Sequence, residues 1–204
     1  MKRLIKKASS KTLYHATSME SLFSIMESGE LRPQEIQVSD FANIENIDRF
    51  FDGDVEEYNK MMSRYVGYTF FAADQGTAQG YGARAAGKSN INNFYAIIIA
   101  ELDEEVLMPD LNDAPNATTW EESIQEVSQV SVLGSVSIDK MTGLIIVENT
   151  YIHMSLNTTF ETWKDDLKKE MAKQVRSGYL DVNACADMWD QLGIPYNPGI
   201  RDDD

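Results

Sequence analysis

Alternation of apolar and polar positions along the chain predicts several short strands. Residues 11–15 alternate, with Leu13 and His15 on one face, and therefore predict a first strand. The clearest strand pattern is Asn93–Leu102, whose apolar part has the length of a buried strand. Shorter strands are predicted over residues 67–72, 129–133, 137–138 and 143–147.

Apolar residues at helical spacing predict the helices between these strands. Ser18 can cap a helix that runs to about Ser28, and Gly29 is a natural stop. Residues 75–86 are helical in pattern but interrupted by glycines, which predicts a short or irregular helix. We also expect a helix over residues 55–65, a loop over residues 36–51, and a loop turning into a short helix over residues 115–126.

Composition changes after Asn149, and the last part of the chain predicts a helical hairpin. Residues 158–176 and 181–192 carry apolar side chains spaced by three or four, and Gly178 separates the two stretches. The chain therefore divides into a basic arm over residues 1–11, a main domain over residues 12–150, and a hairpin with an acidic tail over residues 151–204.

Charge and composition exclude several classes of protein. The formal net charge of the 204 residues is −15, which argues against general binding to nucleic acid, because attraction to phosphate dominates such binding. One cysteine, Cys185, permits neither an intramolecular disulfide nor a cysteine-rich zinc site, so no metal site is expected. No apolar run reaches the length of a membrane span, and no signal peptide is evident, so we expect a cytoplasmic protein.

Two histidines restrict the search for acid–base and ligand-binding chemistry. His153 lies in residues 151–155 with no acidic or cysteine neighbour at ligand spacing, which is typical of a surface or core histidine. His15 lies near the end of a predicted strand and just before a helix cap, where a side chain can project into a cleft. His15 is therefore the starting point for a functional site.

Two blocks of sequence around these elements resemble ADP-ribosyltransferases of the diphtheria-toxin and poly(ADP-ribose) polymerase branch. The first block is Tyr14-His15-Ala16-Thr17, then a helix, then Gly29-Glu30-Leu31-Arg32-Pro33. The second is Gly67-Tyr68-Thr69-Phe70-Phe71-Ala72, followed by Tyr81 ten positions after Phe71, which is the family's spacing. The resemblance covers residues 12–147.

The resemblance implies a fold and a set of roles. The implied fold is α+β, with a split and strongly curved pair of antiparallel sheets around an NAD cleft. His15 would form a hydrogen bond with an adenosine ribose hydroxyl that Thr17 could also reach, and the Ala16 backbone would bond the nicotinamide carboxamide. Tyr81 would stack on the nicotinamide ring, with Phe70 as the opposite aromatic wall.

The sequence departs from the family pattern at two positions. The family has a glutamate where this chain has Gln129, and Glu126, three residues earlier, is the alternative acid if the strand begins sooner; Glu121 and Glu122 are further candidates. Ala16 replaces the usual glycine, which costs energy only if that backbone has a positive φ.

These features lead to two hypotheses of different class. The first is an NAD-dependent mono-ADP-ribosyltransferase that uses NAD as co-substrate and modifies a target protein. The second is a catalytically silent protein of the same fold that serves in binding or as a virion-associated component. The basic residues 1–8 are similar to the start of many small bacteriophage proteins, and a phage origin would suit either an effector that modifies the host or a virion-associated component. A third option, an NAD-using enzyme that removes a phosphate from RNA, would need basic residues near the cleft beyond Arg84 and Lys88.

Overall fold

The computed structural model describes residues 9–33, 54–56, 64, 66–91, 93–148, 152–158 and 160–192. Its centre is a seven-stranded sheet in the order β5-β6-β3-β1-β4-β8-β9, in which every neighbouring pair is antiparallel. The strands of this sheet are β1 (Ser10–Ser18), β3 (Tyr68–Ala72), β4 (Phe94–Asp103), β5 (Met108–Pro109), β6 (Gln129–Leu133), β8 (Met141–Glu148) and β9 (Ile152–Leu156). A second ladder pairs β2 (Glu30–Leu31) with β7 (Val136–Ser137).

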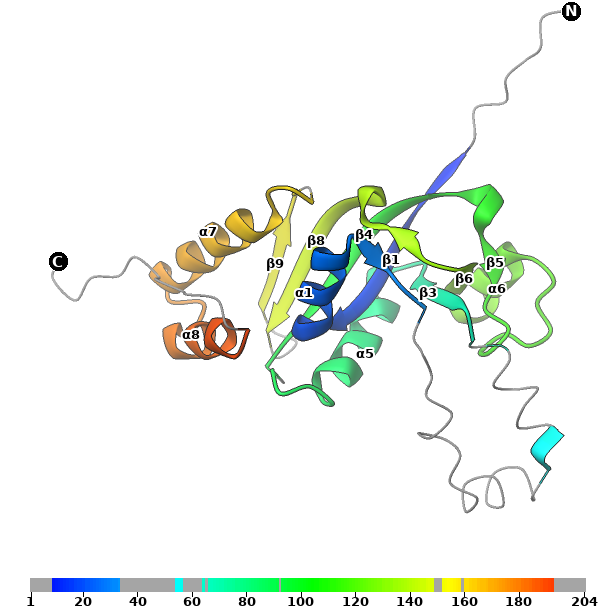
Figure 1. Cartoon of the computed structure of the whole chain (residues 1–204), viewed down its shortest axis with the longest axis horizontal. Coiled ribbons are helices and arrows are strands. Elements are labelled where there is room, and N and C mark those ends of the chain that lie inside the picture. Colours follow the sequence, from blue (N-terminus) through cyan, green and yellow to red (C-terminus); the bar gives the residue numbers. More distant parts are fainter. Residues whose placement is uncertain are drawn as a thin grey trace, which may run out of the picture.

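Helices cover both faces of the central sheet (Figure 1). The helices are α1 (Met19–Ser28), α5 (Gln75–Ala86), α6 (Trp120–Val127), α7 (Trp163–Arg176) and α8 (Val182–Gln191), with short 3₁₀ turns at Glu104–Val106 and Ile138–Lys140. The predicted α+β class with an antiparallel sheet is confirmed. Residues 36–51 and most of residues 55–65, for which we expected a loop and a helix, lie outside the described residues.

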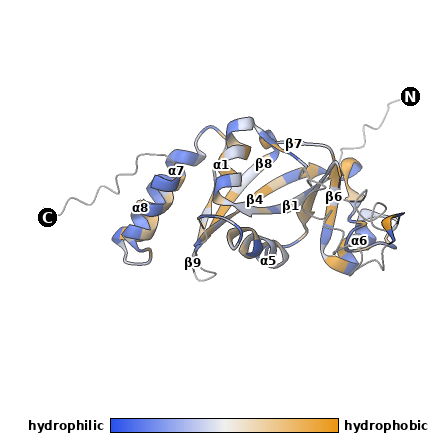
Figure 2. Ribbon diagram, turned by 60° about the horizontal axis from the view of Figure 1, so that its bottom comes forward, coloured by the Kyte–Doolittle hydropathy of each residue, from blue (hydrophilic) through white to orange (hydrophobic). Residues whose placement is uncertain are grey.

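The two faces of β4 explain its long apolar run. Phe94, Ala96 and Ile98 belong to the main hydrophobic core together with α1, whereas Tyr95 and Ile97 belong to a smaller core under α5. Because successive side chains of a strand point to opposite faces, a strand covered on both sides is apolar throughout. Figure 2 shows this hydrophobic colouring along the sheet and a largely hydrophilic α7 at the outside.

Several elements differ from the sequence-based expectation. The first strand begins at Ser10 and runs to Ser18, so it includes two residues assigned to the basic arm. Helix α5 is a regular helix of 12 residues rather than a short or irregular one, because Asp74 caps its first turn and Gly82 allows close packing on Tyr95. Residues 152–156, with His153, form the edge strand β9 of the central sheet, although we expected no strand after residues 143–147.

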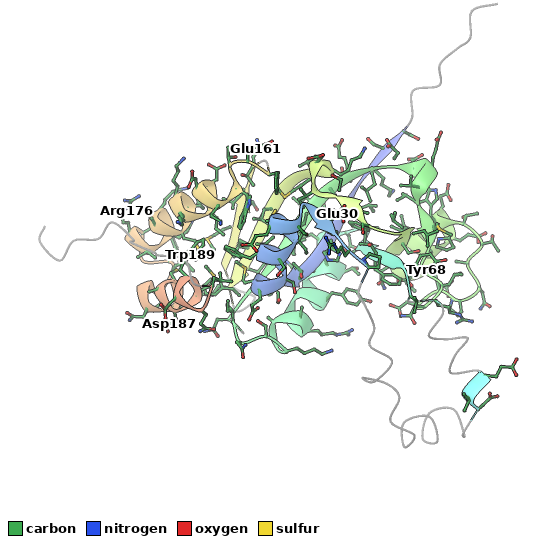
Figure 3. The ribbon with its side chains drawn as sticks, in the orientation of Figure 1. Glu30, Tyr68, Glu161, Arg176, Asp187 and Trp189 are labelled. Carbon is green, nitrogen blue, oxygen red and sulfur yellow. The ribbon has the colours of Figure 1, made fainter. Side chains whose placement is uncertain are left out.

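The C-terminal hairpin packs on the main core. Trp163 of α7 and Trp189 of α8 both form edge-to-face contacts with Phe23 of α1, with ring centroids 4.9 and 5.8 Å apart. Figure 3 shows Trp189 between α8 and the rest of the molecule. These residues belong to the same hydrophobic cluster as Leu13 of β1, so the hairpin and the sheet share one core. Among the described residues, no helix has both the length and the apolar character needed to cross a membrane.

Candidate functional site

The site begins where the central sheet splits. Strand β1 pairs with β4 along its whole length, but it pairs with β3 only at Tyr14↔Ala72. On the other side of the split, β3 pairs with β6 at all five of its positions. The sheet therefore consists of two halves, β5-β6-β3 and β1-β4-β8-β9, joined at one backbone pair, in agreement with the split sheet that the resemblance implied.

His15 bridges the two halves just past this pair. Its Nδ1 lies 2.9 Å from the carbonyl oxygen of Phe70 in β3, and its ring contacts Phe71 edge-to-face at 5.7 Å. Because a carbonyl can only accept, Nδ1 carries the hydrogen of this bond. Burial lowers the pKa of His15 below its ordinary 6.5, more than the bond to Phe70 raises it. His15 is therefore neutral at pH 7, and its Nε2 is an acceptor.

A cleft of about 980 Å³ follows the split and is lined by residues of β1, α1, β3, α5 and the segment after β5. Of the residues that the resemblance singled out, six line the cleft: His15, Ala16, Thr17, Phe70, Tyr81 and Gln129. Glu30, labelled near the centre of Figure 3, and Tyr68, labelled to its right, also line the cleft. The cleft has the size of a small-molecule site, since such sites measure roughly 300–1,000 Å³.

The C-terminal end of β1 forms one wall of the cleft. Ala16 lies opposite Ile97 of β4 and Thr17 lies opposite Ala96. Ala16 lies inside β1, and Ser128 is the one non-glycine residue with positive φ in the described part of the chain. Alanine at this position therefore carries no backbone strain. The Thr17 side chain is buried, with 7% of its surface exposed, so it lies at the base of the cleft rather than at its mouth.

The opposite wall carries Tyr81 of α5. Its hydroxyl donates to Oδ2 of Asp113 at 2.9 Å, and the Arg84 guanidinium lies 5.5 Å from its ring centroid. Burial, followed by the hydrogen bond to Asp113, raises the pKa of Tyr81 to about 12. The phenol therefore stays protonated at neutral pH and keeps donating, while the half-buried Phe70 lines the same cleft from β3.

Gln129 occupies the first position of β6, where the family pattern has a glutamate. It lies opposite Ala72 of β3, has 8% of its surface exposed, and donates from Nε2 to Oδ2 of Asp113 at 2.9 Å. The preceding residue, Ser128, adopts the left-handed conformation with φ 59°, which ends α6 and turns the chain directly into β6. This turn fixes Gln129 at the inner end of the cleft.

Asp113 is a site residue that the resemblance did not supply. The buried carboxylate of Asp110 accepts hydrogen bonds from the backbone N–H groups of Asn112 and Asp113, at 3.0 and 3.3 Å. Ser123 of α6 connects this turn to β6, because its hydroxyl donates to the Gln129 carbonyl at 2.8 Å and accepts from the Asp110 N–H at 3.0 Å. The Asp-Leu-Asn-Asp sequence indicates a turn of this kind, but nothing in it reveals which side chains the turn faces.

Glu126 lies elsewhere. It is exposed on α6 and does not line the cleft, and Glu121 and Glu122 are exposed on the same helix. Glu122 is engaged in capping, because its carboxylate accepts from the Thr118 N–H at 2.7 Å, and these bonds lower its pKa. The structure therefore brings Gln129 to the other predicted residues and leaves these glutamates apart.

Glu20 occupies the far end of the cleft, beside α1. Its carboxylate accepts from the backbone N–H groups of Asn90 and Ile91, at 3.1 and 3.2 Å, and from the Ser89 hydroxyl. Arg32 and Lys88 are the cationic residues that line the described cleft. Glu20 thus connects α1 to the loop after α5, and the two cations stand at the same cleft as His15.

Comparisons with known proteins give the following. No protein-family model matches the chain, and no curated protein matches it closely enough to count. A heat-labile enterotoxin variant shares 17% identity over 72% of this chain and 74% of the other, with a TM-score of 0.42. A second variant, from E. coli, shares 16% over 76% and 80%, with a TM-score of 0.45. EcPltA shares 9% over 76% and 87%, with a TM-score of 0.43. These likenesses concern the general course of the chain and not its residues.

Proposed function

We propose that this protein is an NAD-dependent mono-ADP-ribosyltransferase that modifies a target protein. The observation that carries the proposal is the meeting of His15, Phe70 and Tyr81 on one cleft, although they lie on three separate elements. Each was identified from a sequence block typical of the ADP-ribosyltransferases. The block with His15 and the block with Phe70 and Tyr81 are far apart in the sequence. A cleft of about 980 Å³ offers room for a bent dinucleotide.

The chain's own groups fit NAD at several points. The neutral His15 presents Nε2 as an acceptor for a ribose hydroxyl, since its Nδ1–H is used by the Phe70 carbonyl. Tyr81 and Phe70 offer aromatic faces for the nicotinamide ring, and such contacts contribute roughly 1 kcal/mol beyond buried area. Arg32 and Lys88 provide positive charge for the diphosphate at an otherwise acidic cleft.

A binding protein without catalytic activity is the second candidate, and Gln129 is the observation that favours it. An amide cannot carry the negative charge that stabilises an oxocarbenium-like ribose. In this alternative NAD or a related nucleotide binds in the same cleft, and the protein serves as a sensor or as a virion-associated component. The two candidates share the binding step and differ in bond cleavage.

One experiment separates the candidates. The protein is incubated with NAD labelled on its adenylate group and a bacterial extract, and labelled proteins are detected after electrophoresis; its melting temperature is measured with and without NAD. We expect labelled protein bands and a higher melting temperature with NAD. Loss of both effects in Tyr81→Ala, with an unchanged circular dichroism spectrum, would support the proposed cleft.

Three outcomes of this experiment have distinct meanings. Transfer of label by the wild type supports the transferase. A rise in melting temperature with neither label transfer nor nicotinamide release supports the binding protein. Neither transfer nor a rise in melting temperature at millimolar NAD rejects the transferase and rejects NAD as the ligand of the binding protein. Asp139→Asn is a suitable control, because Asp139 is exposed on the 3₁₀ turn Ile138–Lys140 and does not line the cleft.

A further inference from the structure

A carboxylate stands beside Gln129, although the sequence offers none at that point of the strand. Oδ2 of Asp113 accepts hydrogen bonds from Gln129 Nε2 and from the Tyr81 hydroxyl, each at 2.9 Å. Oδ1 accepts from the Asn112 side-chain amide, also at 2.9 Å. One oxygen of Asp113 is thus held between the two residues that the family resemblance places at the nicotinamide end of the cleft.

The other acids that line the cleft are held differently. Glu20 binds the loop after α5, and Glu30 forms an ion pair with Arg32 at 3.5 Å. Asp110 is buried and its carboxylate accepts from its own turn. Among the described acids of the cleft, Asp113 is the one whose carboxylate contacts both Tyr81 and Gln129.

The position of Asp113 is built by the fold and not by the flexibility of a surface side chain. The Asp110 carboxylate fixes the Asp113 N–H, the Asp110 carbonyl accepts from the Ala114 N–H at 2.8 Å, and the Ser123 hydroxyl joins this turn to the start of β6. The turn and Gln129 therefore keep a fixed relation to each other. The Asp113 side chain is exposed to the cleft, so it can reach a bound substrate.

We propose that Asp113 is the catalytic carboxylate of this cleft, with Gln129 as its hydrogen-bonding partner. The inference rests on the proposed transferase function and adds to it the group that supplies the missing charge. Gln129 keeps the family's position on the strand, and its amide holds the acid one hydrogen bond away. The negative charge is thus moved from the strand to the neighbouring turn.

The reaction balances with the residues at hand. The bond between C1′ of the ribose and the nicotinamide nitrogen breaks, and its electron pair stays on nitrogen, which neutralises the pyridinium. The Asp113 carboxylate stabilises the cationic C1′ that results. A lone pair of the acceptor, a protein nucleophile or water, forms the new bond to C1′, and its proton passes to Asp113 and then to solvent.

The closing experiment measures nicotinamide release from NAD under saturating NAD. Asp113→Asn keeps the shape and removes the charge, and we expect kcat to fall by about 100- to 1,000-fold with little change in KM, as for loss of one transition-state contact. Asp139→Asn, an exposed acid away from the cleft, should keep the wild-type kcat. Melting temperatures of all variants check that they fold.

A charge exchange tests the position directly. In the double variant Asp113→Asn with Gln129→Glu, an amide again faces a carboxylate, but the charge lies on β6. We expect kcat of the double variant to be at least tenfold higher than kcat of Asp113→Asn. A double variant no more active than Asp113→Asn would contradict the view that charge at this point drives the reaction.

Failure of this inference can be told apart from failure of the proposed function. If kcat of Asp113→Asn stays within threefold of the wild-type kcat, the catalytic role of Asp113 is overturned and the proposed transferase function is unaffected. Absence of nicotinamide release and of label transfer in the wild type overturns both. A comparable rise in KM, with kcat unchanged, would reassign Asp113 to NAD binding and overturn its catalytic role.

Discussion

At the scale of single residues, His15 serves the fold and the cleft at once. Its Nδ1–H connects β1 to the Phe70 carbonyl of β3, where the backbone ladder between the two strands has ended. Its Nε2 remains as an acceptor on the cleft side. Protonation would turn that acceptor into a donor and would leave the Nδ1–H bond to Phe70 in place, so the cleft, rather than the contact between the strands, depends on a neutral ring.

The lowered pKa of His15 predicts a pH dependence of stability. The unfolded chain takes up a proton near pH 6.5, whereas the folded protein does so only at a lower pH. Stability is therefore complete above pH 6.5 and falls as the pH drops toward the folded pKa, with a slope of at most about 1.4 kcal/mol per pH unit. Urea titrations of the wild type and of His15→Gln between pH 7.5 and 5 measure this pH dependence. The difference in free energy of unfolding between the two proteins should shrink on acidification. Parallel curves would contradict the prediction.

Positions on the cleft could be predicted only where the sequence itself carries the spacing. His15 and Tyr81 follow from local motifs, and Gln129 from the position at which the family pattern has a glutamate. Asp113 could not be found in this way, because its importance depends on three elements that meet: α5 brings Tyr81, β6 brings Gln129, and a turn closed by Asp110 brings the acid. Such a meeting is a property of the tertiary structure.

At the scale of elements, the close packing of α5 on the sheet depends on one glycine. A Cβ on Gly82 would overlap the buried ring of Tyr95 in β4, whereas a Cβ on Gly80 would meet nothing within 4 Å. The glycines that made this segment look short or irregular therefore have different roles. Gly82 permits close packing, and Gly80 only weakens the helix.

Matched alanine variants of these two glycines test this account. Gly80→Ala should raise the free energy of unfolding by about 0.5–1 kcal/mol, the usual gain of alanine over glycine in a helix. Gly82→Ala should lower it by about 1–3 kcal/mol despite the same gain, because the extra methyl group overpacks the interface with Tyr95. Chemical denaturation followed by circular dichroism measures both. Equal effects of the two substitutions would show that packing on Tyr95 is not the cause.

Periodicity predicted the buried elements well and the edges poorly. Strand β6 has the predicted bounds, Gln129–Leu133, and α1 has the predicted cap Ser18 and stop Gly29. Strand β9 was missed, because an edge strand after a short connection has little pattern of its own. The two residues of β5 are too few to give any period, and they are a strand only because β6 lies beside them.

At the scale of the whole molecule, the hairpin and the sheet form one hydrophobic cluster. Trp163 and Trp189 pack on Phe23 of α1, and Trp120 of α6 packs on the same cluster at the other end of the sheet. Helix α1 directly follows the strand that carries His15. The hairpin therefore supports the cleft through α1, although it contributes no lining residue to it.

A shared core predicts a single cooperative unfolding transition. In Trp120→Phe the fluorescence reports on the hairpin, and in Trp163→Phe with Trp189→Phe it reports on α6. We expect the urea midpoints from fluorescence and from circular dichroism to coincide within each variant, because one core melts as a unit. An earlier transition of the hairpin probe alone would show that α7 and α8 unfold independently of the sheet.

The single backbone pair at the split has a consequence for how this cleft can be altered by selection. In a library that randomises His15, a variant must first keep the contact between β1 and β3 in order to fold, and only folded variants can then be selected for ligand binding. Neutral variation at that position is correspondingly narrow. The turn that carries Asp113 is constrained in the same way, because Ser123 joins it to the start of β6 and Asp113 itself binds Tyr81 and Gln129.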